Sequence, residues 1–284
     1  MNPKIIFTVD LEDWFQVENL RTFFPYHAWE DIDLGRCKKN TYTLLDLFDQ
    51  KDIRCTFFVL SWIAEKMPDL VREVKARGHE IASHGYYHTI LYQLDHKKLK
   101  DEFVKSKSIL EDIIGDKVIG YRAPNFSIND NLLHQIYESG YIYDSSYNSF
   151  SLNRRYGRPL VLKDVKGDVY RVFDNFYEFP VSNLHINNIT LPWAGGAYFR
   201  LIPLFIFTAG VRYILRHKRL FVFYIHPWEI DFTQPRLNIG FQYRIRHYCN
   251  LRNTLKKLSL FLDSFRDYTF VTCKDYLKNG SVNS

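Results

Sequence analysis

The stretch FTVDLEDWF, from Phe7 to Phe15, begins as an apolar strand and ends in aromatic residues, with three carboxylates between them. Lys4 to Val9 is predicted to form a buried β-strand, and Asp10 stands at its carboxyl end. In parallel α/β folds and barrels, the residues just past the strand ends meet at one face, where active sites lie. The position of these acids therefore indicates an α/β protein with a polar site at its strand ends.

Strands and helices alternate along the first half of the chain. Further strands are predicted over Cys55–Leu60, Glu80–Ser83, Val118–Tyr121 and Tyr141–Tyr143, and helices over Asn40–Gln50, Trp62–Arg77, Leu99–Ile114 and Asn131–Ser139. Such alternation is typical of parallel strands that are joined by crossover helices. It predicts an α/β fold built around a parallel sheet.

The second half of the chain changes character. Residues 150–200 contain short strand-like runs and turns with little helical pattern, whereas Phe221–Ile225 returns as a strongly apolar strand. A helix over Leu251–Phe265 and a last strand over Thr269–Thr272 follow. Since no linker or repeat divides the chain, residues 1–284 are predicted to form a single domain, with about 150–200 as an irregular, β-rich cap or insertion.

The composition excludes some classes of protein. The hydrophobic fraction is 46% and the aromatic fraction is 17%, which argues against a disordered chain. The net charge is +6, and the basic cluster of Arg212, Arg216, Lys218 and Arg219 is interpreted as a solvated face, with an anionic membrane surface as the alternative. No nucleic-acid motif accompanies these residues, so nucleic acid is not expected as a partner.

The predicted location is the cytoplasm. The first residues, MNPKIIFTVD, lack the long apolar region of a signal peptide. The longest apolar stretch, Leu201 to Val211, is too short to span a membrane, but it is compatible with peripheral contact with the inner membrane. The four cysteines are scattered without a C-x-x-C pair, as expected for free thiols in a reducing compartment.

A pair of histidines follows the third predicted strand. In GHEIASHGYYH, residues 78 to 88, His84 and His88 are four positions apart. On a helical turn, this spacing places two imidazoles on one side, where they can hold one metal ion. His79 precedes the strand and is expected to lie farther from the site, in a structural role.

Three more strand ends carry residues that suit catalysis. GYRAPNFS contains Arg122, YIYDSSY contains Asp144, and FVFYIHPWEID contains His226. An arginine in this position can pair with a carboxylate, and a histidine beside acids can act as a general acid. Together with Asp10 and the histidine pair, these residues describe a metal hydrolase site with a free carboxylate as base and a histidine as acid.

At these residues, the chain resembles the polysaccharide deacetylases, also called the NodB-homology group or carbohydrate esterase family 4. The family's five motifs have counterparts in the same order, over roughly residues 4 to 275: FTVDLED, SHGYYH, RAP, YDSS and YIHPWE. DLEDWFQV, GGAYFR (Gly195 to Arg200) and HPWEID are similar to motifs of a subgroup that is associated with exopolysaccharide gene clusters.

The resemblance implies a distorted (β/α) barrel, usually of seven strands, and an enzyme that removes acetyl groups from N-acetyl sugars of a glycan. Carried over to this sequence, Asp10 aligns with the catalytic base and Arg122 with the residue that orients it. His84 and His88 align with metal ligands, and His226 aligns with the general acid.

Three features depart from the commonest family pattern. Leu11 follows Asp10 where a second aspartate is usual, so the third metal ligand is either Glu12, which the register favours, or Asp13, which a kinked loop would deliver. The fourth motif lacks its usual downstream tryptophan, which leaves Asp144 as the expected partner of His226 without full support. Asn125 and Phe126 also replace the aromatic-glycine pair that often follows R-x-P.

The implied cofactor is a divalent metal ion, with zinc favoured over cobalt, manganese, nickel and iron. Trp228, Trp193 and Tyr198 are predicted to line a sugar cleft, with core packing as the alternative for each. A cytoplasmic enzyme of this kind is expected to act on an N-acetylated glycan or on a lipid-linked or nucleotide-linked precursor. The sequence does not indicate the sugar, the linkage or the oligomeric state.

Three rival functions remain at this point. An amidohydrolase of similar fold would act on a small nitrogenous metabolite, but the long middle segment and the many aromatic residues favour a glycan. A non-catalytic glycan-binding relative is expected to lack the base or the acid, yet Asp10 and His226 are both present. A non-haem iron oxygenase also uses two histidines and a carboxylate, but its usual antiparallel β-roll does not fit the alternating pattern.

Overall fold

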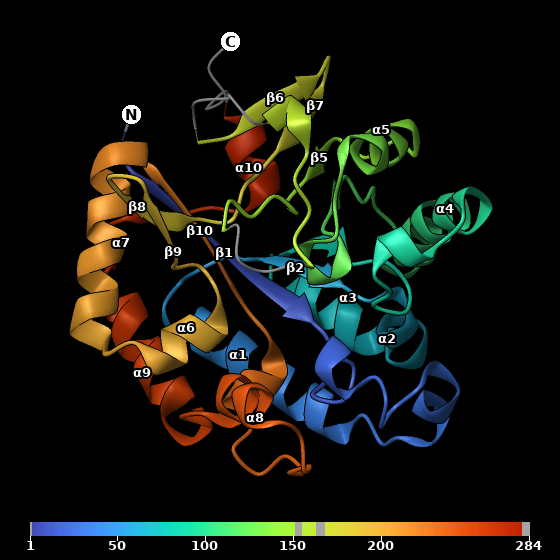
Figure 1. Ribbon diagram of the computed structural model, residues 1–284, viewed down its shortest axis with the longest axis horizontal. Coiled ribbons are helices and arrows are strands. Elements are labelled where there is room, and N and C mark those ends of the chain that lie inside the picture. The colour runs from blue at the N-terminus through green and yellow to red at the C-terminus, as the bar shows by residue number, and fades with distance from the viewer. Residues whose placement is uncertain (1, 151–154, 163–167, 280–284) are drawn as a thin grey trace.

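A curled sheet runs through the middle of the molecule, and helices surround it (Figure 1). The structure is a computed structural model that describes residues 2–150, 155–162 and 168–279. Seven parallel strands make up most of the sheet, and in sheet order they are β10 (Leu220–Ile225), β1 (Lys4–Leu11), β2 (Thr56–Val59), β3 (Glu80–Ser83), β4 (Gly120–Tyr121), β5 (Tyr143–Asp144) and β7 (Phe176–Glu178). This topology confirms the predicted α/β class with seven parallel strands of a distorted barrel.

Two short strands complete the sheet. β6 (Tyr170–Phe173) runs antiparallel to β7 at one edge, and β11 (Thr269–Phe270) pairs with the start of β1. A separate hairpin consists of β8 (Asn183–Ile186) and β9 (Ile189–Pro192). The segment from 150 to 200 therefore adds β7 and β6 to the main sheet, while residues 151–154 and 163–167 lie outside the described residues.

The helices connect the strands on the outer side of the sheet (Figure 1). They are α1 (Gly35–Gln50), α2 (Ser61–Lys66), α3 (Pro68–Ala76), α4 (His96–Ile114), α5 (Asp130–Glu138), α6 (Gly196–Leu201), α7 (Leu204–Lys218), α8 (Phe241–Tyr248), α9 (Leu251–Asp263) and α10 (Cys273–Lys278). The first five follow the expected alternation with strands. The sequence did not predict α6, α7, α8 and α10, and α7 lies partly where only an apolar stretch was noted.

The helix predicted over Trp62–Arg77 is in fact two helices. α2 ends at Lys66, and α3 begins at Pro68 after Met67 adopts φ −136° and ψ 59°. A proline restricts the residue before it to extended conformations and cannot donate a backbone hydrogen bond within a helix. Pro68 is tolerated because it occupies the first turn of the new helix.

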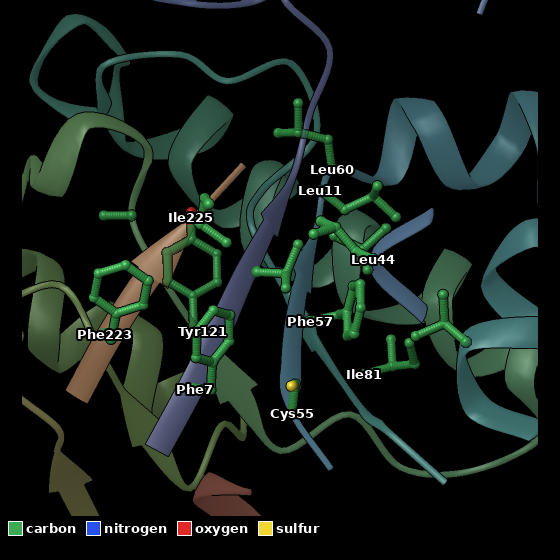
Figure 2. Close-up of a cluster of buried hydrophobic side chains, with 14 of the residues drawn as sticks. Phe7, Leu11, Leu44, Cys55, Phe57, Leu60, Ile81, Tyr121, Phe223 and Ile225 are labelled. Carbon is green, nitrogen blue, oxygen red and sulfur yellow. The ribbon is translucent and has the colours of Figure 1, made fainter. Parts of the chain in front are cut away.

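Strand β1 is buried on both faces, which explains its continuous apolar sequence. Phe7 and Leu11 point into the large cluster between β1, β2, β10 and α1, together with Leu44 and Phe57 (Figure 2). Ile6 points to the opposite face and packs in a second cluster, which also contains Phe58, Ala82 and Tyr143. Side chains alternate along a strand, so Thr8 and Asp10 follow Ile6 on this second, inner face.

Candidate active site

The carboxyl ends of adjacent strands lie next to one another, and polar residues follow them directly. The backbone N–H of His84 donates to the carbonyl of Val59, and that of Arg122 donates to the carbonyl of Ser83, each at 2.9 Å. His226 follows β10, which pairs with β1 over its whole length. Because neighbouring parallel strands are held in register, the side chains at their ends meet over one end of the sheet.

Glu12, His84 and His88 form a buried cluster at this end. One ligand atom from each residue lies within 4.8 Å of the others, and His88 Nε2 lies 3.1 Å from Glu12 Oε2. Glu12 lies just past the end of β1, and its carboxylate is buried beside both imidazoles. Two imidazoles and one carboxylate are a donor set that fits zinc or another divalent first-row metal ion.

A loop, rather than the expected helical turn, brings the two histidines together. The backbone turns at Gly85, with φ +76°, and at His88, with φ +55°. A Cβ atom at Gly85 would lie 2.6 Å from the carboxylate of Glu102, which accepts a hydrogen bond from the N–H of Tyr86. The spacing of the histidines was therefore a correct signal, but the helical geometry inferred from it was wrong.

Burial keeps both imidazoles neutral, which is the form that binds a metal ion. It lowers the pKa of His84 to about 4, and burial together with the nearby His84 lowers the pKa of His88 well below its usual value. Nδ1 of His84 lies 2.8 Å from the carbonyl oxygen of Arg122, so a proton on Nδ1 leaves the lone pair on Nε2. Burial raises the pKa of Glu12 to about 7, and a bound cation would favour its ionised form.

Asp13, the alternative third ligand, does not join the cluster. Its Oδ1 accepts a hydrogen bond from the N–H of Trp14 at 2.8 Å, and its nearest charged neighbours include Asp231 and Arg36. The chain turns after β1, since the N–H of Glu12 donates to the carbonyl of Asp10. The structure thus brings Glu12, and not Asp13, to the two histidines.

Asp10 forms a buried ion pair with Arg122. Arg122 Nη1 lies 2.6 Å from Asp10 Oδ1 and also donates to Thr8 Oγ1, while its other nitrogens donate to the carbonyl and the hydroxyl of Ser145. The guanidinium also lies over the ring of Phe58, 4.0 Å from its centroid. These contacts hold the side chain of Arg122, and through it the carboxylate of Asp10, in one position.

His226 lies among three carboxylates. Its Nε2 lies 3.1 Å from Glu12 Oε1 and 3.9 Å from Asp10 Oδ2, and its Nδ1 lies 2.7 Å from Glu229 Oε1. Burial alone would lower the pKa of His226, but the carboxylates of Glu12, Glu229 and Asp10 raise it to about 9. The imidazolium form, which can donate a proton, is therefore stabilised here.

Glu229 is the partner of His226, and the sequence did not assign it this role. Its Oε2 lies 2.8 Å from Arg200 Nε, and both side chains are almost fully buried. Although burial opposes it, the charges of Arg200 and His226 lower the pKa of Glu229 to about 2. A Cβ atom at Gly196 would lie 2.1 Å from this carboxylate, so only glycine permits the close approach of α6.

Asp144 does not support His226, which corrects the prediction for the fourth strand end. Its carboxylate accepts hydrogen bonds from the N–H and the hydroxyl of Ser146, at 3.0 and 2.7 Å. It also faces Glu178 of β7, and burial raises the pKa of both carboxyl groups. Asp144 therefore belongs to a buried structural pair below the site.

A pocket opens over these residues and contains the predicted base, acid and ligands. Its lining includes Asp10, Glu12, His84, His88, His226, Phe126, Arg155, Tyr156, Tyr224, Trp228, Arg246 and His247. The ring of Trp228 stacks on His226 with 5.3 Å between centroids and on His247 with 4.4 Å. Trp228 thus forms part of the pocket wall, as the sequence predicted for a cleft residue.

The other two predicted cleft residues behave differently. Trp193 is buried, stacks on Phe207 at 5.7 Å between centroids and donates its indole N–H to the Phe207 carbonyl. Gly210 of α7 makes this packing feasible, because a Cβ atom there would lie 2.4 Å from the indole ring. Trp193 is therefore a core residue, and Tyr198 lies just outside the lining, with Tyr156 and Arg246 as its electrostatic neighbours.

The missed pair of Arg200 and Glu229 had a signal in the sequence. Both residues fall inside stretches that resemble subgroup motifs, GGAYFR and HPWEID, but that resemblance gives neither residue a chemical role. The two stretches are far apart along the chain, and only the folded structure shows that they contact each other. A conspicuous charged residue in each stretch was the available hint of an ion pair.

Two family models together cover most of the chain. Residues 26–143 match the model described as polysaccharide deacetylase, and residues 145–278 match one described as a domain of unknown function (DUF3473). The boundary between the matches falls beside β5, and yet β7, β10 and β11 share one sheet with β1 to β5. The two matched regions therefore contribute strands to the same sheet.

Among curated proteins, the chain is similar to the peptidoglycan-N-acetylglucosamine deacetylase of Bacillus cereus. The two are 29% identical over 121 residues, which cover 42% of this chain and 44% of that protein. The peptidoglycan deacetylase of Helicobacter pylori is 27% identical over 110 residues, or 38% of each chain. This chain thus matches less than half the length of these relatives.

Solved structures show a similar fold over nearly the whole chain. A protein from Mycobacterium smegmatis that is assigned as a polysaccharide deacetylase has a TM-score of 0.63 at 20% identity. The match covers 98% of this chain and 89% of that protein. The PuuE allantoinase has a TM-score of 0.66 at 14% identity, and the match covers 97% of this chain and 89% of the allantoinase. At these identities, the likeness shows the fold alone, and it agrees with the parallel, curled sheet.

Proposed function

We propose that this chain, whose residues 26–143 match the polysaccharide deacetylase family model, is a metal-dependent hydrolase that removes N-acetyl groups from amino sugars of a glycan or glycan precursor. The observation that carries the proposal is the meeting of three groups in one pocket. These groups are the Glu12–His84–His88 cluster, the Asp10–Arg122 ion pair and the protonated His226. Each of the three has a distinct role in hydrolysing an amide.

Glu12, His84 and His88 would hold the metal ion. Zinc is the favoured ion, because it readily accepts two imidazole nitrogens and one carboxylate oxygen. When bound, such an ion polarises an amide carbonyl and makes water easier to deprotonate. The buried, neutral imidazoles are ready to coordinate without first losing a proton.

Asp10 is proposed as the general base and His226 as the general acid. Asp10 would accept a proton from the attacking water, with Arg122 fixing the direction of its carboxylate. His226 would donate its proton to the nitrogen of the leaving amine, and Glu229 orients its ring through Nδ1. Nε2 is the donating atom, since it faces Glu12 and Asp10 across the pocket.

The presence of both groups distinguishes this proposal from a purely glycan-binding protein. A binding protein has no need for an oriented base and an imidazolium on opposite sides of a metal-ligand cluster. Here both Asp10 and His226 point to the cluster, and each has a buried charged partner, Arg122 and Glu229. This arrangement supports catalysis as the function of the pocket.

Acetate release from N-acetylglucosamine oligomers tests the proposal. Wild type, Asp10→Asn and His84→Ala are compared with and without a chelator, and His134→Ala serves as the matched control because His134 is exposed on α5. We expect release that needs metal, is lost in the first two variants and persists in His134→Ala. Metal binding without release from any glycan would instead favour a small-molecule amidohydrolase, and no metal binding would remove the proposed site.

We further propose an exopolysaccharide or a lipid-linked precursor as the biological substrate, and contact with the cytoplasmic face of a membrane. No described helix is both long and apolar enough to cross a bilayer. Support for peripheral contact comes from α7 and the residues before it, where Phe205 is 74% exposed and Leu201 and Ile206 are also exposed. Arg212 and Arg216 on the same helix add positive charge that favours anionic lipids.

Co-sedimentation with phospholipid vesicles tests this contact. We expect binding to vesicles that contain phosphatidylglycerol, weak binding to pure phosphatidylcholine, and loss of binding in Phe205→Ser and in a variant with Arg212 and Arg216 changed to glutamine. Equal sedimentation of wild type and both variants with anionic vesicles would disprove the contact without affecting the proposed catalytic activity.

A further inference from the structure

Three arginines among the described residues line the active-site pocket, and two of them, Arg155 and Arg246, lie beside the catalytic groups. Arg155 comes from the segment after β5, and Arg246 comes from the last turn of α8. Among the described residues, the other arginine that lines the pocket is Arg200, whose charge is paired with Glu229. The Asp10–Arg122 pair beneath the pocket is likewise internally balanced.

Arg246 differs from these paired arginines in its surroundings. Within the part of the chain that the structure describes, no carboxylate oxygen lies within 4.0 Å of its guanidinium. The groups that face it are the phenols of Tyr156, Tyr198 and Tyr224. Neutral phenols leave the positive charge of Arg246 available to an anion in the pocket, and they can supply further hydrogen-bond donors.

The backbone that carries Arg246 is held firmly although α8 is largely exposed. Arg200 Nη2 donates to the carbonyl of Arg246 at 2.8 Å, and Arg200 Nη1 donates to the carbonyls of His247 and Cys249. His247 Nε2 also lies 2.9 Å from Gln234 Oε1. The same buried arginine that holds Glu229 therefore also fixes the position of the pocket-lining end of α8.

The opposite part of this wall is equally well anchored. The N–H of Gly157 donates to the carbonyl of Phe126, and a Cβ atom at Gly157 would lie 1.5 Å from the carbonyl oxygen of Ile128. This close approach, which only glycine allows, places Arg155 and Tyr156 at the pocket. Both arginines are thus presented next to backbone that contacts neighbouring segments directly, at Gly157 and at the end of α8.

We propose that Arg246, assisted by Arg155, forms an anion-binding subsite that recognises a carboxylate or phosphate group on the glycan. The inference rests on the proposed deacetylase function and names its substrate class as an acidic, N-acetylated glycan or glycan phosphate. A guanidinium presents two parallel N–H donors that match the oxygens of either group. Tyr224, which faces Arg246, also packs against His226, with 5.7 Å between the ring centroids. The anion would therefore belong to the reacting sugar or to its direct neighbour.

Matched sugar probes test the subsite by binding, without need of turnover. Affinities for a hyaluronan tetrasaccharide, which carries carboxylates, and for neutral chitotetraose are measured by calorimetry on metal-loaded Asp10→Asn protein. Arg246→Gln and Arg246→Lys are then each added to the Asp10→Asn protein. Arg244→Gln is the control, because Arg244 is exposed on the same helix and does not line the pocket. Comparing N-acetylglucosamine 1-phosphate with N-acetylglucosamine tells a phosphate ligand from a carboxylate ligand.

We expect at least one acidic probe to bind about 10-fold more tightly than its neutral match, as charge-assisted hydrogen bonds would give. Arg246→Gln should abolish this preference, Arg246→Lys should restore only part of it, and Arg244→Gln should keep it. Equal affinity of the Asp10→Asn protein for acidic and neutral probes, or a preference that survives Arg246→Gln, would overturn the subsite.

Turnover separates this inference from the proposed function. In the protein with Asp10 intact, Arg246→Gln should raise KM for the acidic substrate about 10-fold and leave kcat within twofold, because the residue binds away from the reacting amide. Acetate release from chitotetraose without any preference for acidic sugars would uphold the deacetylase and reject the subsite. Acid-selective binding without release from any probe would uphold the subsite and reject the deacetylase.

Discussion

Arg200 and Glu229 form an ion pair of 2.8 Å in which both side chains are almost completely removed from solvent. Glu229 in turn holds the imidazole of His226, while Arg200 also binds three backbone carbonyls at and just after the end of α8. One buried pair therefore connects the proposed general acid with the pocket wall that carries Arg246. Its removal should disturb stability and catalysis together.

Replacing Arg200 by methionine should destabilise the protein by about 3–5 kcal/mol, because it leaves the Glu229 carboxylate and three carbonyls buried without their partner. Chemical denaturation measures the free energy of unfolding. The double variant with Glu229→Gln should lose less than the sum of the two single losses, since the neutral amide no longer needs a counter-charge. Losses that add to within about 0.5 kcal/mol would show that the two residues are not coupled.

Gly196→Ala should lower kcat for acetate release and destabilise the fold by about 1–3 kcal/mol. The new methyl group would lie 2.1 Å from the Glu229 carboxylate, which must then move and take the ring of His226 with it. Gly240→Ala is the control, because its nearest neighbour is a side-chain atom of Tyr243 at 3.5 Å. Equal activity of the two variants would contradict the role of Gly196.

Glu12→Gln should weaken zinc binding by about 100-fold or more, whereas Asp13→Asn should change it by less than about threefold. The reason is that Glu12 faces His84 and His88 while Asp13 accepts a hydrogen bond from Trp14. Competition with a fluorescent chelator measures both affinities under the same conditions. A larger loss in Asp13→Asn than in Glu12→Gln would reassign the carboxylate ligand.

His79 should make the protein less stable in acid. Burial lowers its pKa to about 4 in the folded state, so between about pH 6.5 and pH 4 the unfolded chain binds a proton that the folded chain does not. The contribution of His79 to stability is full above this range and falls as the pH drops through it, by at most about 3 kcal/mol.

His79→Asn isolates this contribution. Nδ1 of His79 accepts a hydrogen bond from the N–H of Cys55 at 3.0 Å, and the amide oxygen of asparagine can replace it without titrating. We expect the wild type to lose about 2–3 kcal/mol more than the variant when the pH is lowered from 7 to 4.5, as measured by urea denaturation at both values. Parallel losses in the two proteins would mean that His79 does not titrate differently on folding.

Several features of the fold and the site were predictable from the sequence. Continuous apolar runs such as Lys4–Val9 and Phe221–Ile225 identified buried parallel strands, and the polar residues that follow them indicated where a site would form. The register of the first motif favoured Glu12 but left Asp13 open as the third ligand, and the structure places Glu12 beside the two histidines. These inferences depend on periodicity and chain direction, which are local properties of a sequence.

Other features depended on contacts between distant segments. The break at Pro68 was visible in the sequence, although the helical pattern continued past it. Trp193, by contrast, lies in the core because Gly210 of α7 leaves space for its ring. Asp144 faces Glu178 rather than His226. Glu229 became the partner of His226 because Arg200 neutralises it from another helix.

The sequence by itself determined the class of fold, most of its parallel strands and the kinds of groups at their ends, because strand burial and alternation are encoded by neighbouring residues. Only the tertiary structure decided which carboxylate faces the histidines, which acid supports His226 and which arginine is left with phenols as its nearest partners. Those choices follow from desolvation and charge pairing, which act over a few ångströms in space between residues that the chain separates widely.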